Sequence, residues 1–275
     1  MRPLALLSSL AVASVATSAS AQIPELARGK TIDVVHDARD TKHFDEAWTG
    51  RMFIPREALG APAEPRPLLV FLHGVNTDHT RFRFVGGKPE EPDLRIIVAR
   101  LVERGVIPPL VVGAPTTTIA CEIPFTMWPS FDLDRFVERA VRALRPHAAI
   151  DLERVVVVGH SGAGCNATGG LMSAVAGTSL HLRGVMSIDT CMADTDAQIA
   201  AVTLPDTDLI VTWQPLTWPR PFDAFSSVFR AASGAATGRR LLDEFRPPAN
   251  AHAHNAMVEL TLEKHLATVL AGPVG

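Results

Sequence analysis

Residues 155–164 have the sequence VVVVGHSGAG, and this stretch is the strongest indication of the fold. The four consecutive valines predict a short strand that is covered on both faces, as in a parallel sheet. Gly159 precedes Ser161 by two positions and the small residues 162–164 follow it, which indicates a tight turn directly after the strand. Such a turn strains the backbone of its apical residue and leaves no room for neighbouring side chains. The stretch therefore predicts a strand, a turn that presents the Ser161 hydroxyl, and a helix of small residues over about 165–176.

Short apolar strands and amphipathic helices alternate along the rest of the chain. Strands are predicted at residues 31–36, 48–54, 68–72, 110–112, 155–158, 182–188, 209–213 and 241–245. Helices are predicted at residues 93–104, 132–144, 165–176 and 255–270, and another is expected to begin near Asp223. This alternation predicts an α/β fold with a mainly parallel central sheet that is flanked by helices on both faces.

The composition fits a single domain, with nearly equal numbers of acidic and basic residues. Of the 275 residues, 47% are hydrophobic, which is enough for one sizeable core, so residues 22–275 are predicted to form a single domain. Lys and Arg together number 26 against 29 Asp and Glu, which leaves no basic stripe for a phosphate backbone. Nucleic acid is therefore excluded as a partner.

The first 21 residues have the three parts of a secretory signal. Arg2 supplies a positive start, residues 4–21 are uncharged and rich in Leu, Ala, Val and Ser, and the run ends in the small residues 19–21. A membrane anchor needs about 20 predominantly apolar residues, whereas serines and threonines interrupt this run. A signal peptide at residues 1–21 is predicted, and with it a secreted or periplasmic protein without a stable membrane span.

The turn at Ser161 resembles the nucleophile elbow, Gly-x-Ser-x-Gly, of the α/β-hydrolase family, although Ala163 replaces the last glycine. A phosphate-binding turn is the alternative, but the chain has neither Gly-x-Gly-x-x-Gly nor a P-loop lysine there. The resemblance implies the α/β-hydrolase fold. It also implies a serine hydrolase in which Ser161 forms an acyl-serine intermediate and no cofactor is needed.

The resemblance further implies an oxyanion hole in the loop after an earlier strand, commonly introduced by His-Gly. Residues 68–72 run directly into His73 and Gly74. The donors to the negative oxygen would be the backbone amides of Val75 and Gly162. Asn76 would either add a side-chain donor or order the loop.

A serine nucleophile needs a histidine base, and the family supplies it just before the final helix. His254 is the first choice because it would abut a helix capped by Asn255, and His252 is the alternative.

The triad also needs an acid that orients the histidine. The usual family position follows the strand at 209–213, where this chain has Gln214 and no acid before Asp223. Asp189 ends the preceding strand and is preferred, as in some branches of the family, with Asp223 as the alternative.

The three cysteines, Cys121, Cys165 and Cys191, allow one disulfide and one free thiol in an oxidising compartment, and the pairing is open. Their spacing is too wide for a Cys-x-x-Cys site, and no metal is predicted.

The substrate is less defined. Aromatic residues fall in loops expected to overhang the site, where they would wall an apolar pocket or pack as core: Phe125, Trp128, Trp213, Trp218 and Phe222. The resemblance favours a small-molecule or polymeric carboxylic ester. An acyltransferase or peptidase with the same triad, and a non-catalytic binding protein on the same scaffold, are the alternatives.

Overall fold

The computed structural model describes residues 28–35, 49–60, 64–80, 82–84, 92–118, 120–129, 131–216, 222–250 and 252–272. The predicted signal peptide at residues 1–21, the polar segment at residues 36–48 and Trp218 lie outside the described residues.

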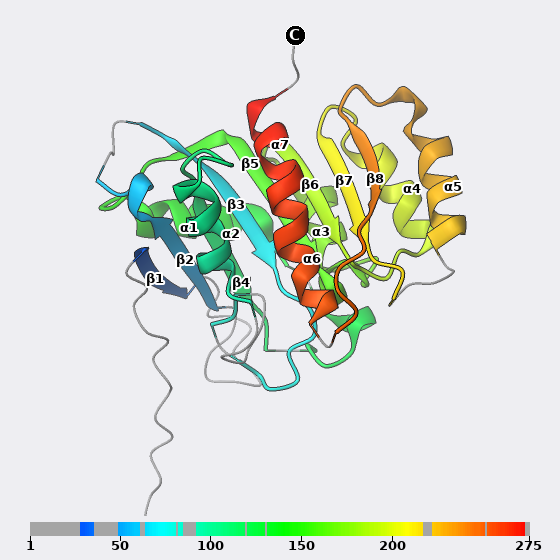
Figure 1. Ribbon diagram of the computed structural model, residues 1–275, viewed down its shortest axis with the longest axis horizontal. Coiled ribbons are helices and arrows are strands. Elements are labelled where there is room, and N and C mark those ends of the chain that lie inside the picture. Colours follow the sequence, from blue (N-terminus) through cyan, green and yellow to red (C-terminus); the bar gives the residue numbers. More distant parts are fainter. Residues whose placement is uncertain are drawn as a thin grey trace, which may run out of the picture.

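The centre of the protein is an eight-stranded sheet with the order β1-β2-β4-β3-β5-β6-β7-β8 (Figure 1). The strands are β1 (Gly29–Val35), β2 (Thr49–Pro55), β3 (Arg66–Leu72), β4 (Val111–Thr116), β5 (Ile150–His160), β6 (Leu182–Ile188), β7 (Asp208–Trp213) and β8 (Arg240–Glu244). β2 pairs antiparallel with both β1 and β4, and all other neighbouring strands are parallel. The predicted mainly parallel sheet is confirmed.

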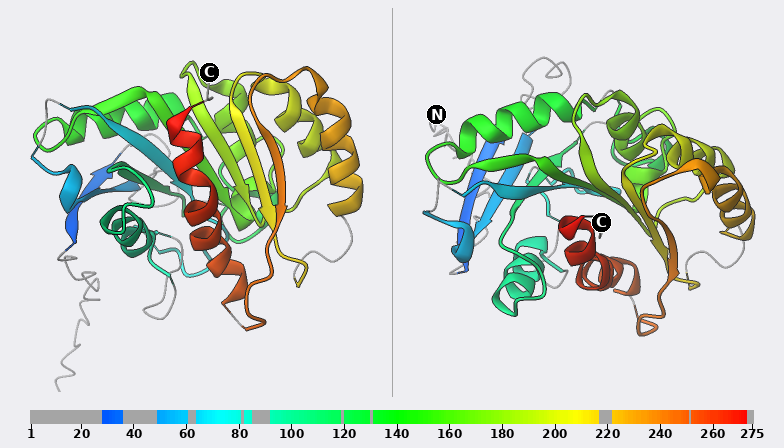
Figure 2. Two further views of the ribbon diagram at one scale, coloured as in Figure 1. Left: turned by 45° about the horizontal axis from the view of Figure 1, so that its top comes forward. Right: turned by 90° about the horizontal axis from the view of Figure 1, so that it is seen from above.

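Helices cover both faces of the sheet, as the view from above shows (Figure 2). They are α1 (Leu94–Glu103), α2 (Leu133–Leu144), α3 (Gly170–Gly177), α4 (Asp194–Thr203), α5 (Phe222–Ala232), α6 (Ala253–Thr261) and α7 (Ala267–Ala271). A π-helical turn (Leu262–Leu266) joins α6 to α7. α1, α6 and α7 pack on one face, and α2 to α5 pack on the other.

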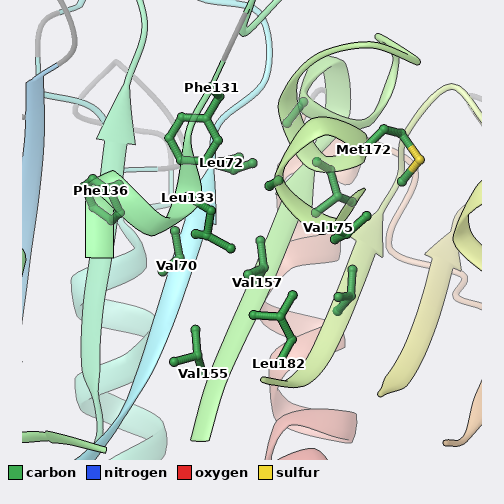
Figure 3. Packing of buried hydrophobic residues seen from close by; sticks show 14 of the residues in the cluster. Val70, Leu72, Phe131, Leu133, Phe136, Val155, Val157, Met172, Val175 and Leu182 are labelled. Carbon is green, nitrogen blue, oxygen red and sulfur yellow. The ribbon is translucent and has the colours of Figure 1, made fainter. Parts of the chain in front are cut away.

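The valine run explains how β5 connects these two layers. Val155 and Val157 belong to the core under α2 to α5, whereas Val156 and Val158 belong to the core under α1, α6 and α7. Figure 3 shows Val155 and Val157 among side chains from neighbouring strands and from α2 and α3. All four valines are fully buried. Burying a side chain of this size stabilises the fold by about 1.5–3 kcal/mol, so the run ties β5 to both layers.

α1 and α2 begin where the sequence predicts, because an aspartate caps each of them. Asp93 accepts a hydrogen bond from the amide of Arg95, and Asp132 accepts one from the amide of Arg135.

Two helix boundaries differ from the prediction. The helix predicted at residues 165–176 begins only at Gly170, after a 3-10 turn over Ser161–Gly164 and an irregular stretch. Glycine is a poor helix former, and Gly170 itself has a φ of +53°. The final helix begins at Ala253 with His252 at its N-cap, so the prediction that Asn255 caps it was wrong.

α4 was not predicted because its sequence has no strong apolar stripe. Among its described side chains, the buried apolar ones are the small Ala197 and Ala201, so the helical period is hard to see in the sequence.

Candidate active site

Ser161 lies at the apex of the turn between β5 and the 3-10 turn η3 (Ser161–Gly164), and it is half-buried. Its φ of +56° is in the left-handed region, which costs a residue with a side chain about 1–3 kcal/mol. Gly74 packs directly against it. A Cβ added at Gly74 would lie 2.5 Å from Ser161 Cβ and 2.8 Å from its Oγ, so only glycine fits there. The loop after β3 therefore packs directly against the side chain of Ser161.

The two amides expected to bind an oxyanion lie next to each other beside Ser161. A Cβ added at Gly162 would lie 3.4 Å from the Val75 nitrogen and 2.6 Å from Met127 Sδ. Within the described part of the chain, the N–H groups of Val75 and Gly162 donate to no protein acceptor. Two adjacent unused donors next to a hydroxyl form a suitable place for a negative oxygen.

His73 anchors the oxyanion loop, which we define as residues 73–76. It is fully buried, its Nδ1–H donates to Gly74 O at 2.6 Å, and its Nε2 accepts from Thr117 N at 3.1 Å. Because Nε2 accepts a hydrogen bond, the imidazole is neutral with its proton on Nδ1. Burial lowers the pKa of His73 to about 3, with a smaller contribution from the positive charge of Arg83. The carbonyl of His73 also accepts a hydrogen bond from Trp128 Nε1 at 3.0 Å.

Asn76 orders the same loop. Its side-chain amide donates to Thr80 O at 3.0 Å and to Thr117 O at 3.1 Å. Its Oδ1 accepts from Thr80 N at 3.0 Å and from Arg83 Nη1 at 3.1 Å. Arg83 Nη1 also donates to Val75 O at 2.7 Å. Both amide hydrogens of Asn76 are used by backbone carbonyls outside the oxyanion loop, so of the two roles considered for it, the geometry supports ordering.

His254 and Asp189 come together from distant parts of the sequence. His254 Nδ1 lies 2.6 Å from Asp189 Oδ2, and the side chains are 33% and 0% exposed, respectively. His254 belongs to the first turn of α6, and Asp189 follows β6 with a φ of +50°. A carboxylate can only accept a hydrogen bond, so Nδ1 is the donor and this contact favours the tautomer with Nδ1–H. The Nε2 lone pair is then available to accept a proton.

Gln214 holds the carboxylate in place, a role that the sequence analysis missed. It follows β7, where the family usually has its acid. Its Nε2 donates to Asp189 Oδ2 at 2.9 Å and its backbone N donates to Oδ1 at 3.3 Å. The backbone amide of Asp189 also donates to Thr212 O at 2.8 Å. The sequence signal that could have revealed this role was a polar residue, Gln214, directly after the strand that pairs with β6.

His160 connects the end of β5 with the start of α6, and this contact was also missed. It is buried, its Nε2–H donates to His254 O at 3.2 Å, and the two ring centroids are 4.6 Å apart. Burial, followed by the neighbouring His254, lowers the pKa of His160 well below its usual value. The residue before Ser161 is therefore a neutral histidine that contacts His254.

The alternative acid and base lie elsewhere. Asp223 is in the first turn of α5, where it lines an open polar pocket with Trp213, Arg230 and Glu244. His252 is exposed. The structure thus pairs His254 with Asp189.

The aromatic residues proposed to wall a pocket behave differently from one another. Trp128 is fully buried and packs against Phe131, so it is a core residue. Trp213 is 8% exposed and stacks on Phe222 with ring centroids 3.4 Å apart. Phe125 is 65% exposed, which leaves it available to contact a ligand.

The cysteine pairing left open by the sequence is Cys165–Cys191, and Cys121 is a buried free thiol. Burial raises the pKa of Cys121. No cluster of three His, Cys, Asp or Glu side chains that could hold a metal ion occurs among the described residues. Over the same residues, no helix has the length and apolar character needed to cross a membrane.

Comparison with known proteins rests on structure alone, because no family model matches the sequence and no curated protein matches it either. A ferulic acid esterase superposes with a TM-score of 0.58 at 15% identity, covering 89% of this chain and 98% of that one. An S-formylglutathione hydrolase from Agrobacterium tumefaciens gives 0.54 at 13% identity, covering 89% and 95%. A thermostable esterase gives 0.54 at 17% identity, covering 89% of this chain and 62% of the esterase.

These similarities agree with the strand order and with the tight turn after β5. The protein therefore has the α/β-hydrolase fold.

Proposed function

We propose that this protein is an exported serine hydrolase that cleaves a carboxylic ester through an acyl-Ser161 intermediate. His254 is the general base, Asp189 orients it, and the amides of Val75 and Gly162 bind the oxyanion. No cofactor takes part in this mechanism.

The observation that carries the proposal is the 2.6 Å hydrogen bond between His254 Nδ1 and Asp189. A neutral imidazole that keeps its proton on Nδ1 has a basic Nε2, which is what a serine hydroxyl needs in order to lose its proton. The left-handed backbone of Ser161 and the unused amides beside it support the same assignment.

In the first half of the reaction, Ser161 Oγ attacks the acyl carbon while its proton passes to His254 Nε2. The carbonyl oxygen becomes negative and receives hydrogen bonds from the two amides. His254 then returns the proton to the leaving alcohol, and the acyl group stays on Ser161. In the second half, water attacks the acyl-serine in the same way, which releases the acid and restores the hydroxyl.

The choice of an ester bond is supported by the fold neighbours, which include a ferulic acid esterase and an S-formylglutathione hydrolase. An oxygen ester and a thioester are cleaved by the same acyl transfer to serine. Export is supported by the signal-like residues 1–21 and by the disulfide, because disulfides persist in oxidising compartments.

A fluorophosphonate probe tests the proposal. It should label the protein covalently, and Ser161→Ala should abolish both labelling and the hydrolysis of chromogenic esters while the circular dichroism spectrum stays unchanged. A folded protein that takes no label would favour a binding protein. Parallel assays with peptides, and product analysis with an added alcohol as acyl acceptor, distinguish a peptidase and an acyltransferase from an esterase.

A further inference from the structure

The turn that carries Ser161 has little support from local structure. After η3 ends at Gly164, no regular helix follows until α3 begins at Gly170. Glycines at 162, 164, 169 and 170 make this stretch intrinsically flexible. We call residues 161–169 the nucleophile turn. Local hydrogen bonds within it join residues only two or three positions apart, such as Cys165 N to Gly162 O and Gly169 N to Asn166 O, so tertiary contacts must fix the turn relative to the rest of the site.

One side of the nucleophile turn is held by hydrogen bonds to the loop at residues 127–129. Asn166 Nδ2 donates to Met127 O at 2.7 Å, and Gly169 pairs with Pro129 in an isolated β-bridge. At the end of the turn, Gly170 N donates to Trp128 O at 3.2 Å.

The other side is held by a covalent bond. Cys165 directly follows η3, and Cys191 lies two residues after Asp189, with their Cα atoms 4.9 Å apart. The disulfide therefore joins the turn that carries Ser161 to the loop that carries Asp189. Asp189 and Met192 in that loop both have positive φ values of 50° and 56°, so its backbone is also unusual.

A narrow cavity of about 20 Å³ is lined by residues next to both cysteines, including Gly164, Thr190 and Met192. Asp196 also lines it, and its Oδ1 is buried and has no hydrogen-bond partner among the described residues. Close packing normally fixes a loop against its neighbours, and where this cavity borders the two cysteines the disulfide supplies a fixed connection that side-chain packing does not.

We propose that the Cys165–Cys191 disulfide is a positioning element of the active site, which keeps Ser161 in register with the His254–Asp189 pair. The inference rests on the proposed function. Gln214 holds the Asp189 carboxylate independently at 2.9 Å, so loss of the disulfide acts chiefly on Ser161. Reduction then lowers turnover while the fold persists.

Reduction adds two electrons and two protons to the sulfur–sulfur bond and yields two thiols. A water-soluble phosphine supplies the electrons and becomes a phosphine oxide, with its oxygen taken from water. Cys121→Ser is the parent variant for this experiment, because it leaves the disulfide as the only cysteine redox site of the sequence.

The test measures kcat, KM and the rate of fluorophosphonate labelling for the parent variant, oxidised and reduced, at a temperature well below its unfolding transition. Reduction should lower kcat and the labelling rate by about 10- to 100-fold, the range expected for a small misplacement of a reacting group. KM should change little, and reoxidation with oxidised glutathione should restore both rates. Cys165→Ser combined with Cys191→Ser should reproduce the loss without a reductant.

Three outcomes would overturn the inference. An unchanged kcat after complete reduction, with a lower melting temperature, would show that the bond only stabilises the fold. Loss of the native circular dichroism spectrum on reduction would assign the bond to folding. An oxidised protein without labelling or esterase activity would overturn the proposed function itself, before the disulfide is altered.

Discussion

The oxyanion loop and the nucleophile turn meet at Ser161, but they are held in different ways. The oxyanion loop is fixed by hydrogen bonds from His73, Asn76 and Arg83. The nucleophile turn has fewer hydrogen bonds and is tied to the Asp189 loop by the Cys165–Cys191 disulfide. Neither loop contains regular helix or strand beyond the short 3-10 turn.

The difference implies that the oxyanion loop is sensitive to pH and that the nucleophile turn is sensitive to reductants. The hydrogen-bonded loop requires a neutral His73, because a second ring proton would leave Thr117 N–H without its acceptor. The cross-linked turn contains no such titrating anchor, and it depends on the redox state of two sulfurs. Protonation of His73 should therefore disturb the oxyanion loop, whereas reduction of the disulfide should disturb the nucleophile turn.

The largest expected effect concerns Asp189, in the loop that the disulfide joins to the nucleophile turn. Asp189→Asn should lower kcat by about four powers of ten, as when a serine protease loses its triad aspartate, because the histidine adopts the wrong tautomer. The disulfide and the circular dichroism spectrum should not change. Kinetics with a chromogenic ester give the measurement.

Asp223→Asn is the matched control, since Asp223 lies on α5 in a separate polar pocket. If Asp223→Asn abolished turnover and Asp189→Asn did not, the assignment of the acid would be wrong.

A smaller effect should distinguish the two loops directly. Asn76→Ala removes four hydrogen bonds from the oxyanion loop, which has no covalent tie, and should lower kcat by about 100-fold. Asn166→Ala removes the side-chain hydrogen bond to Met127 O, but the disulfide remains, so kcat should fall by less than about tenfold. Both variants are compared in the oxidised state.

Reduction of the Cys165–Cys191 disulfide tests the same difference between the two loops. Reduction should lower kcat of Asn166→Ala by a larger factor than that of the parent, because the Asn166 hydrogen bond and the disulfide are then both lost. Equal losses in the Asn76 and Asn166 variants would contradict the difference between the loops.

The smallest expected effect concerns stability in acid. The pKa of His73 is lowered to about 3 in the folded protein from 6.5, so between these values the unfolded chain binds a proton that the folded protein does not. The contribution of His73 to the free energy of unfolding is then fully present above pH 6.5 and decreases as the pH drops towards 3. The slope contributed by one such histidine is at most about 1.4 kcal/mol per pH unit.

Urea denaturation at several pH values between 4 and 7 measures this slope. His73→Asn should make the decrease shallower, although His160, whose pKa is also lowered, keeps part of it. Substitution of the exposed His181 by Asn is the control. An unchanged slope in His73→Asn would exclude His73 as the acid-sensitive anchor of the oxyanion loop.

Much of the fold could be predicted from the sequence because its signals are local. The valine run with its glycine-rich continuation indicated β5 and the turn at Ser161, and the aspartates at 93 and 132 marked two helix starts. α4 escaped prediction because small alanines make up much of its buried face, and the start of α3 was misplaced because glycines interrupt the helix.

The sequence indicated where the Ser161 hydroxyl is presented and which histidines and acids could lie near it. Only the tertiary structure decided that His254 meets Asp189 rather than Asp223, that Gln214 holds the carboxylate, and that Cys165 pairs with Cys191. Strand periodicity and turn chemistry depend on residues a few positions apart. The pairings depend on which strands become neighbours in the sheet, and residues far apart in the chain settle that order when they pack into a common core.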